Sequence, residues 1–299
     1  MIPYNRQPLF FFDSGPVSIA GFISEASQNL EHKTVESFGE EWKKFKDFSE
    51  DEIRIAGEQY FDIVDDSILN NEAVVLDLGC GTGRWSKFIA PKVKFIEAVD
   101  PSMAVLTAQK TLEPFNNVRV TQAAADNLPF ANESFDFIFS LGVLHHIPDT
   151  SKALTEAVTR LKKNGHFLLY IYYALDSRGF LFRSLFKVSD WVRKIISSLP
   201  HSIKHFLCDI IAVLVYMPLI IIARIFKGLG MNFYKRLPLS YYCDKSFYII
   251  RNDVLDRFGT PLEQRFTRQE IETMMKQAGL GNITFSEHQP YWHAIGRKI

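Results

Sequence analysis

The stretch VLDLGCGTG, residues 75–83, decides how this sequence folds. It begins as a short apolar run and ends in three closely spaced glycines, the pattern of a buried parallel strand followed by a tight turn. Glycine lets the backbone bend sharply and approach a ligand closely. The helix expected next offers free N–H groups to an anion. The stretch therefore predicts a ligand-binding turn at the carboxyl end of a strand.

Strands and helices are expected to alternate outward from this turn. Further strands are predicted at residues 94–100, 117–123, 134–144 and 166–173. The helix over residues 150–165 is expected to stop at Gly165. A helix over 266–280 and two closing strands in an antiparallel hairpin complete the pattern. This alternation predicts an α/β fold with a doubly wound, Rossmann-like sheet.

The same pass along the chain predicts three parts. Residues 1–70 are an acidic leader, with fourteen Asp or Glu against six Lys or Arg, and are expected to form a helical N-terminal cap that includes a helix over 49–69. Residues 71–173 and 266–299 form the sheet domain. Residues 174–265 form a mainly helical insertion, far longer than the usual connection of about 2–6 residues.

The glycine turn excludes two common phosphate sites. A dinucleotide fingerprint requires G-x-G-x-x-G, but Arg84 and Ser86 occupy the third glycine position in the two frames. No lysine-serine pair of a P-loop follows. A ligand with a carboxylate and an amino group fits better, with Asp77 facing the amine.

Two further acids follow the next two predicted strands. A carboxylate at Asp100 can accept hydrogen bonds from both hydroxyls of a ribose, as in dinucleotide folds. Asp126 can accept from an adenine amino group. Since parallel strands end at one edge of an open sheet, these acids and Asp77 are expected to converge where ligands bind in such folds.

With these residues in place, the sequence resembles the class I S-adenosylmethionine-dependent methyltransferases. The likeness lies in VLDLGCGTG, AVDPSMAVLTAQK, AAADNLPFANESFDFIFSLGVLHHIPD and TRLKKNGHFLLY, and is greatest to the small-molecule branch with the ubiquinone and menaquinone methyltransferases. It implies a seven-stranded sheet whose last strand is antiparallel, and S-adenosyl-L-methionine as cofactor, with no metal. The residues that it implies for the cofactor are Asp77, Gly79, Gly81 and Gly83 at the methionine part, Asp100, Pro101 and Met103 at the ribose and adenine, Asp126 and Asn127 at the adenine ring, and Ser140 and Leu141 beside the sulfonium.

The methyl acceptor is less closely defined. The Asn-Pro-Pro-Tyr type of sequence that nucleobase-amine methyltransferases carry after the fourth strand is replaced here by SLGVLHHIP, so no nucleic acid is expected as partner. His145 and His146 are candidate catalytic bases, because an imidazole can remove a proton from a hydroxyl near neutral pH. A structural pair closing the loop is the alternative. We expect transfer to oxygen or carbon of a small-molecule or lipid-linked acceptor. Trp42 and Phe45 in the leader are expected to form a lid, or one more packed helix.

Charge is unevenly distributed along the chain, and the basic excess lies in the insertion. The whole chain has 34 basic and 34 acidic residues, but residues 178–236 hold ten basic and two acidic ones, a net charge of +8. Residues 180–199 have the spacing of a basic amphipathic helix, and 210–223 are uncharged and broken by Pro218. The uncharged run is compatible with a cap helix over the substrate, an interfacial segment or a membrane span. We expect 178–236 to face an anionic membrane surface.

The cysteine content and the start of the chain indicate a cytoplasmic protein. The insertion adds the expectation that it associates with a membrane on the cytoplasmic face. Cys80, Cys208 and Cys243 are too few and too scattered for a disulfide framework or a zinc site. The first residues do not have the pattern of a secretory signal. Two rival functions stay open: a non-catalytic partner protein with the cofactor fold at a membrane, and an RNA methyltransferase.

Overall fold

The computed structural model describes residues 1–299 except 15–16, 25–28, 45–47, 175–179, 289 and 291. The chain divides into two compact units. The sheet unit comprises Met1–Ser177 and Leu262–Ile299, and the insertion unit comprises Arg178–Pro261.

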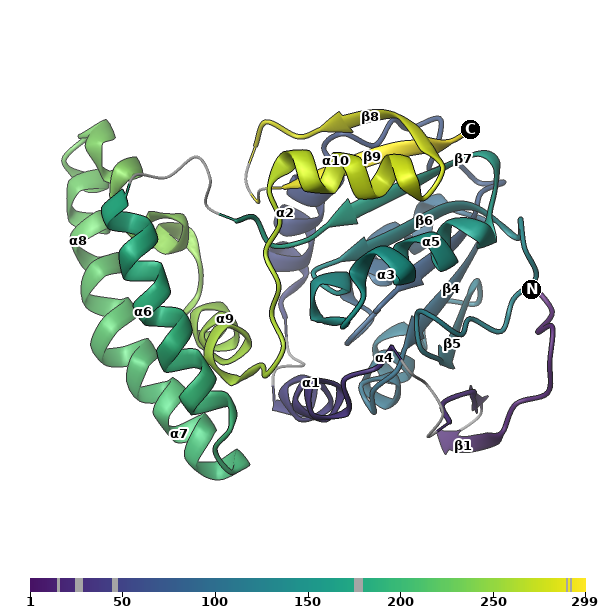
Figure 1. The fold of residues 1–299 in the computed structure, drawn as a ribbon, viewed down its shortest axis with the longest axis horizontal. Helices are drawn as coiled ribbons and strands as arrows, with labels where there is room; N and C mark the ends of the chain where they lie inside the picture. Colours follow the sequence, from purple (N-terminus) through teal and green to yellow (C-terminus); the bar gives the residue numbers. More distant parts are fainter. Residues whose placement is uncertain (15–16, 25–28, 45–47, 175–179, 289, 291) are drawn as a thin grey trace. The chain divides into compact units, whose positions relative to one another are not determined.

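The sheet unit is built on one mixed sheet with the order β1-β2-β5-β4-β3-β6-β7-β9-β8 (Figure 1). The strands from β3 to β7 run parallel, and β9 is antiparallel to both β7 and β8. Their bounds are β1 Phe10–Ser14, β2 Val17–Gly21, β3 Val74–Leu78, β4 Phe95–Asp100, β5 Val118–Gln122, β6 Phe135–Leu141, β7 Leu161–Tyr170, β8 Leu280–Phe285 and β9 His293–Lys298. The predicted seven-stranded Rossmann-like sheet, with its last strand antiparallel, is confirmed in β3 to β9.

Helices cover both faces of this sheet. One face packs on α5 and α10, and the other on α2 and α3, with α4 beside α3. Alternation along β3 divides the core, because Leu76 and Leu78 point to the first face and Val75 to the second. The bounds are α1 His32–Lys44, α2 Glu50–Tyr60, α3 Arg84–Ile89, η1 Ala90–Lys92, α4 Val105–Leu112, η2 Leu144–His146, α5 Thr150–Arg160 and α10 Arg268–Gln277.

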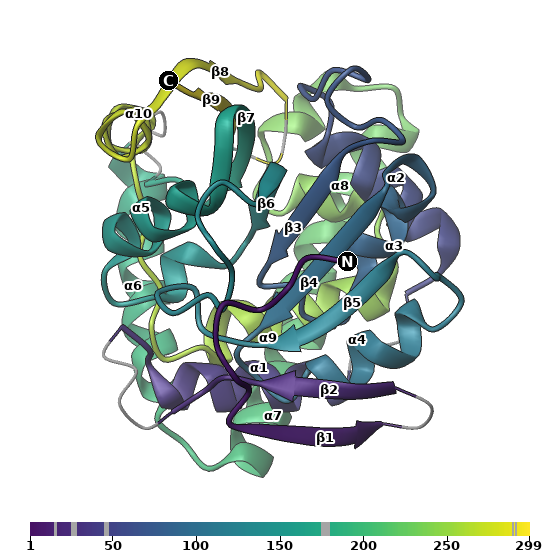
Figure 2. The ribbon, with the colours of Figure 1, turned by 90° about the vertical axis from the view of Figure 1, so that its right-hand side faces the viewer.

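The leader is not purely a helical cap, and the prediction was wrong on this point. The β1–β2 hairpin extends the sheet, because β2 pairs in parallel with β5 (Figure 2). The helix expected over 49–69 begins as predicted, with Ser49 and Glu52 forming a reciprocal cap, but ends at Tyr60. The next residues leave the helix because the Asp62 carboxylate accepts a hydrogen bond from Ser286 Oγ at 2.7 Å and lies 2.7 Å from His293 Nε2.

The helix expected over 150–165 is also too long. It ends at Arg160, and β7 starts at Leu161, so Gly165 lies inside a strand instead of stopping a helix. The pairing register between β6 and β7 shifts between Phe135 and Phe137, as at a β-bulge. A Cβ atom at Gly165 would come within 2.8 Å of the carbonyl oxygen of Asp136, so glycine serves a close backbone approach here.

The insertion unit consists of helices. Its elements are α6 Phe180–Ser197, α7 His201–Ile211, the π-helical turn η3 Ala212–Tyr216, α8 Met217–Gly228, η4 Asn232–Arg236, η5 Ser240–Asp244 and α9 Phe247–Gly259. The predicted amphipathic helix is α6. The uncharged run is not broken by Pro218, because α7, η3 and α8 form one continuous helix of 28 residues. The wide turn η3 ends two residues before Pro218, which lacks an N–H to donate.

Candidate cofactor site at the carboxyl edge of the sheet

The glycine turn after β3 requires glycine for its backbone. Gly79, Gly81 and Gly83 have φ angles of +85°, +52° and +80°, in the left-handed region. A Cβ at Gly79 would come within 2.4 Å of Val143, and one at Gly81 within 3.2 Å of the Trp42 indole nitrogen. The turn is therefore tightly enclosed, and any side chain at these positions would collide or strain the backbone.

Asp77 lies fully buried at the end of β3. Its Oδ2 accepts a hydrogen bond of 2.7 Å from the hydroxyl of Ser86, which lies in the first turn of α3. Burial raises the pKa of Asp77 from 3.8 to about 7, and the nearby negative charge of Asp100 adds to the rise. A cationic group placed here would favour the ionised form, so the side chain suits recognition of an amine.

Asp100 ties the glycine turn to the turn after β4. Its Oδ2 accepts from the Gly81 N–H at 2.9 Å, and its Oδ1 accepts from the N–H and the hydroxyl of Ser102 at 2.8 and 2.6 Å. Burial raises the pKa of this carboxyl. A carboxylate has about four acceptor positions, and three are used here. For Asp100 to accept from two ribose hydroxyls, the Ser102 hydroxyl would have to turn aside. The sequence did not reveal this competing donor.

The acceptors at the end of β5 include one residue that the sequence analysis missed. Gln122 pairs in register with Asp100, donates from Nε2 to the carbonyl of Pro101 at 3.1 Å, and has a buried Oε1 without a hydrogen-bond partner among the described residues. Asp126 Oδ2 accepts from the Asn29 N–H at 3.2 Å, whereas its buried Oδ1 has no such partner within the described part of the chain. Both orphaned oxygens are suited to an N–H donor such as an adenine amino group. Gln122 could have been found from the sequence, because it ends the predicted strand next to the one that ends in Asp100.

The remaining predicted adenine and sulfonium residues are placed as follows. Asn127 receives two hydrogen bonds from the Arg6 guanidinium, so its side chain is already engaged by the leader. Met103 is 36% exposed beside this turn. Ser140 is fully buried and donates to the carbonyl of Leu78 at 2.9 Å, which ties β6 to β3, and Leu141 is buried beside it. The roles of Asn127 and Ser140 toward a ligand stay predictions.

The leader helix α1 covers this edge. A Cβ at Gly39 would lie 3.6 Å from the Met103 backbone nitrogen, and Trp42 contacts Gly81. The Arg84 guanidinium lies 5.3 Å from the centre of the Trp42 ring and 4.5 Å from that of Trp85. Trp42 is thus placed over the glycine turn, where a lid was expected, and Phe45 lies outside the described residues.

His145 and His146 belong to an aromatic cluster after β6. The rings of His146 and Tyr172 each lie 3.9 Å from that of His145, centre to centre. His145 is fully buried, and burial lowers its pKa well below the ordinary value, so it is uncharged. His146 Nδ1 lies 2.7 Å from the carbonyl of Leu262, which can only accept, so Nδ1 carries a proton and Nε2 is the acceptor atom of the neutral ring. His146, and not His145, has the tautomer fixed for accepting a proton.

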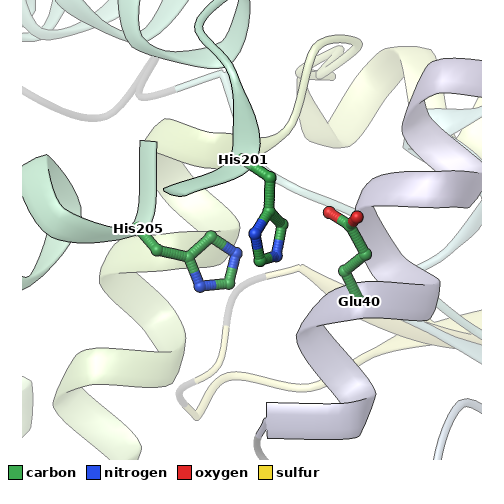
Figure 3. Close-up of side chains that lie close together, drawn as sticks. All are labelled: Glu40, His201 and His205. Carbon is green, nitrogen blue, oxygen red and sulfur yellow. The ribbon is translucent and has the colours of Figure 1, made fainter. Parts of the chain in front are cut away.

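The insertion unit contains a second histidine pair. His201 and His205 lie one turn apart on α7, with ring centres 3.9 Å apart (Figure 3). Among the described residues of the insertion unit, no third His, Cys, Asp or Glu joins them. The pair carries no metal site on its own. All three cysteines are buried, and none of them forms a disulfide.

The parallel sheet, the glycine turn and the acids at its carboxyl edge define a class I methyltransferase fold. A family model described as "Methyltransferase domain" matches residues 76–169. This part of the chain is therefore a methyltransferase domain of the class I, S-adenosylmethionine-dependent kind, and it is similar to proteins named as methyltransferases. The predicted family is confirmed.

Three curated relatives show the range of this likeness. An uncharacterised methyltransferase of Bacillus subtilis (strain 168) is 35% identical over 103 residues, which cover 33% of this chain and 41% of that protein. A ubiquinone/menaquinone biosynthesis C-methyltransferase of Campylobacter jejuni is 28% identical over 120 residues, covering 38% and 50%. A tRNA U34 carboxymethyltransferase of Campylobacter curvus is 32% identical over 108 residues, covering 35% and 36%. The chain spans half or less of the length of these relatives.

Solved structures are similar over more of the chain. The YcgJ protein of Bacillus subtilis has a TM-score of 0.48 at 18% identity, covering 76% of this chain and 70% of that one. A methyltransferase of Aquifex aeolicus has a TM-score of 0.48 at 15% identity, covering 87% and 96%.

Proposed function

We propose that this protein transfers a methyl group from S-adenosylmethionine to an oxygen or carbon atom of a small or lipid-linked acceptor. The observation that carries the proposal is the glycine turn joined to Asp100 by the Gly81 hydrogen bond, beside Asp77, in the segment that the methyltransferase model matches. S-adenosylmethionine supplies a methyl group on a sulfonium, which leaves as a neutral thioether. The protein's task is then mainly placement.

The residues at this edge fit that donor. Asp77 faces its amine and is poised to ionise, because its pKa is about 7. Asp100 accepts from the ribose once the Ser102 hydroxyl turns away. The orphaned oxygens of Gln122 and Asp126 match the donors of an adenine amino group. The narrow turn, with Trp42 against Gly81, excludes water from one side of the donor.

His146 is the residue that we assign to proton removal when the acceptor arrives as a hydroxyl. Its Nδ1–H is held by the Leu262 carbonyl, which orients the ring and makes Nε2 the atom that accepts the proton. His145 packs against it and holds the ring in place, and its pKa, lowered by burial, makes it a poor base for the same proton. An acceptor carbon that is already nucleophilic needs no base.

The insertion supports a lipophilic acceptor over a polar one, because its long helix exposes a row of large apolar side chains. The relatives do not separate small molecules from RNA, since they include both a quinone C-methyltransferase and a tRNA carboxymethyltransferase.

The test is to incubate the protein with methyl-labelled S-adenosylmethionine and cell extract, then to separate lipids, small molecules and RNA. Label in the lipid or small-molecule fraction, absent with Gly81→Arg, supports the proposal. Label confined to RNA would replace the acceptor assignment. No label in any fraction, together with retained donor binding, would favour a non-catalytic role.

A further inference from the structure

The long helix of the insertion unit, His201–Gly228, has two unlike faces. Lys204, Cys208, Ala212, Ile220 and Ala223, spaced three, four or eight residues apart, are buried. Large apolar side chains are exposed on the rest of its circumference. These residues, named here the outward face, are Ile203, Phe206, Val213, Leu214, Val215, Leu219, Ile221, Ile222 and Ile225. A row of this kind is not scattered surface, because it follows one helix over about six turns.

Two charged groups of this helix, Asp209 and Arg224, are held by other elements of the insertion unit. Asp209 forms a two-fold ion pair with Arg251 of α9, with N–O distances of 2.7 and 2.9 Å. Arg224 donates to the carbonyls of Cys243 and Lys245 at 2.8 and 3.1 Å. These contacts fix the rotation of the helix against α9 and η5. The outward face is left to contact something other than the insertion unit itself.

An apolar groove opens along the outward face. It has a volume of about 430 Å³ and is lined by Val213, Met217, Pro218, Ile221 and Phe247. Pro218 contributes because the π-helical turn before it widens the helix at this point. No charged side chain lines the groove among the described residues. It is suited to a flexible hydrocarbon chain, which needs no polar partner.

The charge of the insertion unit indicates that the partner of the outward face is anionic as well as apolar. The insertion unit has thirteen Lys or Arg and five Asp or Glu, a net charge of +8, whereas the rest of the chain has −8. Lys235 and Arg236, in η4 just beyond the helix, are exposed and form no ion pair within the described residues. Phe233 in the same turn is 52% exposed. Apolar side chains bordered by free cations and an aromatic ring match an anionic lipid surface.

The length of the uncharged segment decides between lying on a bilayer and crossing it. Between Asp209 and Arg224 lie fourteen uncharged residues, about 21 Å of helix at ~1.5 Å per residue. The hydrocarbon core is about 30 Å thick. By length and composition alone the 28-residue helix could span it. However, crossing would draw the paired Asp209 and Arg224, with their partners on α9 and η5, into the hydrocarbon.

We propose that the outward face docks this protein onto the surface of an anionic lipid bilayer, with the long helix lying in the interface and an acyl chain entering the groove at Pro218. The helix inserts its apolar row beneath the headgroups. Lys235 and Arg236 contact the anionic headgroups at its end. This docking does not depend on methyl transfer.

The test uses the full chain and vesicles of phosphatidylcholine with 30% phosphatidylglycerol, compared with phosphatidylcholine alone. Leu214→Glu/Ile221→Glu places two charges on the outward face. Phe11→Glu/Ile55→Glu is the matched control, because both residues are exposed apolar side chains of the sheet unit. Circular dichroism and S-adenosylmethionine binding confirm that each variant is folded, so a failure of docking is distinct from a failure of the proposed function.

The wild-type protein and the control should sediment with the anionic vesicles, while the outward-face variant should lose at least tenfold in vesicle affinity. Lys235→Glu/Arg236→Glu should lose several-fold, and alkaline carbonate should release the bound wild-type protein. Equal binding by the outward-face variant and its matched control would overturn the proposal. Resistance to carbonate would overturn it in favour of a spanning helix. A wild-type dimer that becomes a monomer in the outward-face variant, without vesicle binding, would overturn it by assigning the face to a second copy of the chain.

Discussion

Replacing Asp77 by asparagine separates two effects of its buried charge: it lowers the stability of the folded protein, and it binds the amine of the methyl donor. The carboxyl is fully buried and its pKa rises from 3.8 to about 7, so its ionisation costs the folded state about 4 kcal/mol, at 1.36 kcal/mol for each pH unit. The amide that replaces it would keep an oxygen for the Ser86 hydroxyl. We therefore expect Asp77→Asn to stabilise the free protein at pH 8, by a few kcal/mol at most.

The sign of the pH dependence follows from the same shift. Because the folded pKa lies above the unfolded one, the folded state binds more protons between about pH 4 and 7, and the wild-type protein loses stability as the pH rises through this range. Between pH 5.5 and 8 this residue should cost about 2 kcal/mol, a loss that Asp77→Asn should not show. Glu97, whose pKa also rises to about 7 through burial, has the same effect in both proteins and cancels in the comparison.

Donor binding should change in the opposite direction. The variant lacks the charge that faces the amine, so we expect its Kd for S-adenosylmethionine to rise about 30-fold, or about 2 kcal/mol. Urea unfolding at pH 5.5 and 8 measures the first effect and calorimetry the second. A variant that is less stable than wild type at pH 8, yet binds the donor equally well, would contradict both roles given to the Asp77 carboxylate.

Four further outcomes follow from the geometry. Between pH 5 and 7 the wild-type affinity for S-adenosylmethionine should fall up to tenfold for each pH unit of acidification, while Asp77→Asn shows a flat profile over the same range in calorimetric titrations. Gly79→Ala, with a Cβ 2.4 Å from Val143, should unfold at a markedly lower temperature than Gly279→Ala, which has no atom within 4 Å and shares the positive φ. His146→Ala should cut label transfer to a hydroxyl acceptor at least 100-fold without changing donor affinity, whereas His145→Phe should stay within tenfold; equal losses would contradict the assignment. Arg119→Met leaves the buried Glu97 without the ion pair of 2.7 Å and should cost about 3–5 kcal/mol in urea unfolding, against less for the double variant with Glu97→Gln.

The residues near the glycine turn were predictable because local rules decide them. The apolar run of β3 and the left-handed glycines that follow it each depend on neighbours a few positions away. Their convergence at one sheet edge then follows from parallel topology alone.

The features that the sequence did not reveal depend on distant partners. The β1–β2 hairpin is fixed by pairing with β5, about a hundred residues away. Ser102 competes for Asp100, and Arg6 occupies Asn127, through contacts that no spacing rule contains. The continuity of the helix through Pro218 depends on a π-helical turn that accommodates the missing donor. The uncharged run over residues 210–223 indicated neither the full length of this helix nor its outward face.

A calorimetric titration with S-adenosylmethionine, run on the wild-type protein and on Gly81→Arg, tests whether the glycine turn holds the methyl donor. We expect one molecule to bind per wild-type chain and none to bind the variant, whose side chain would fill the turn against Trp42. Binding of equal strength in a correctly folded Gly81→Arg protein, or none in the wild type, would contradict the assignment of this site.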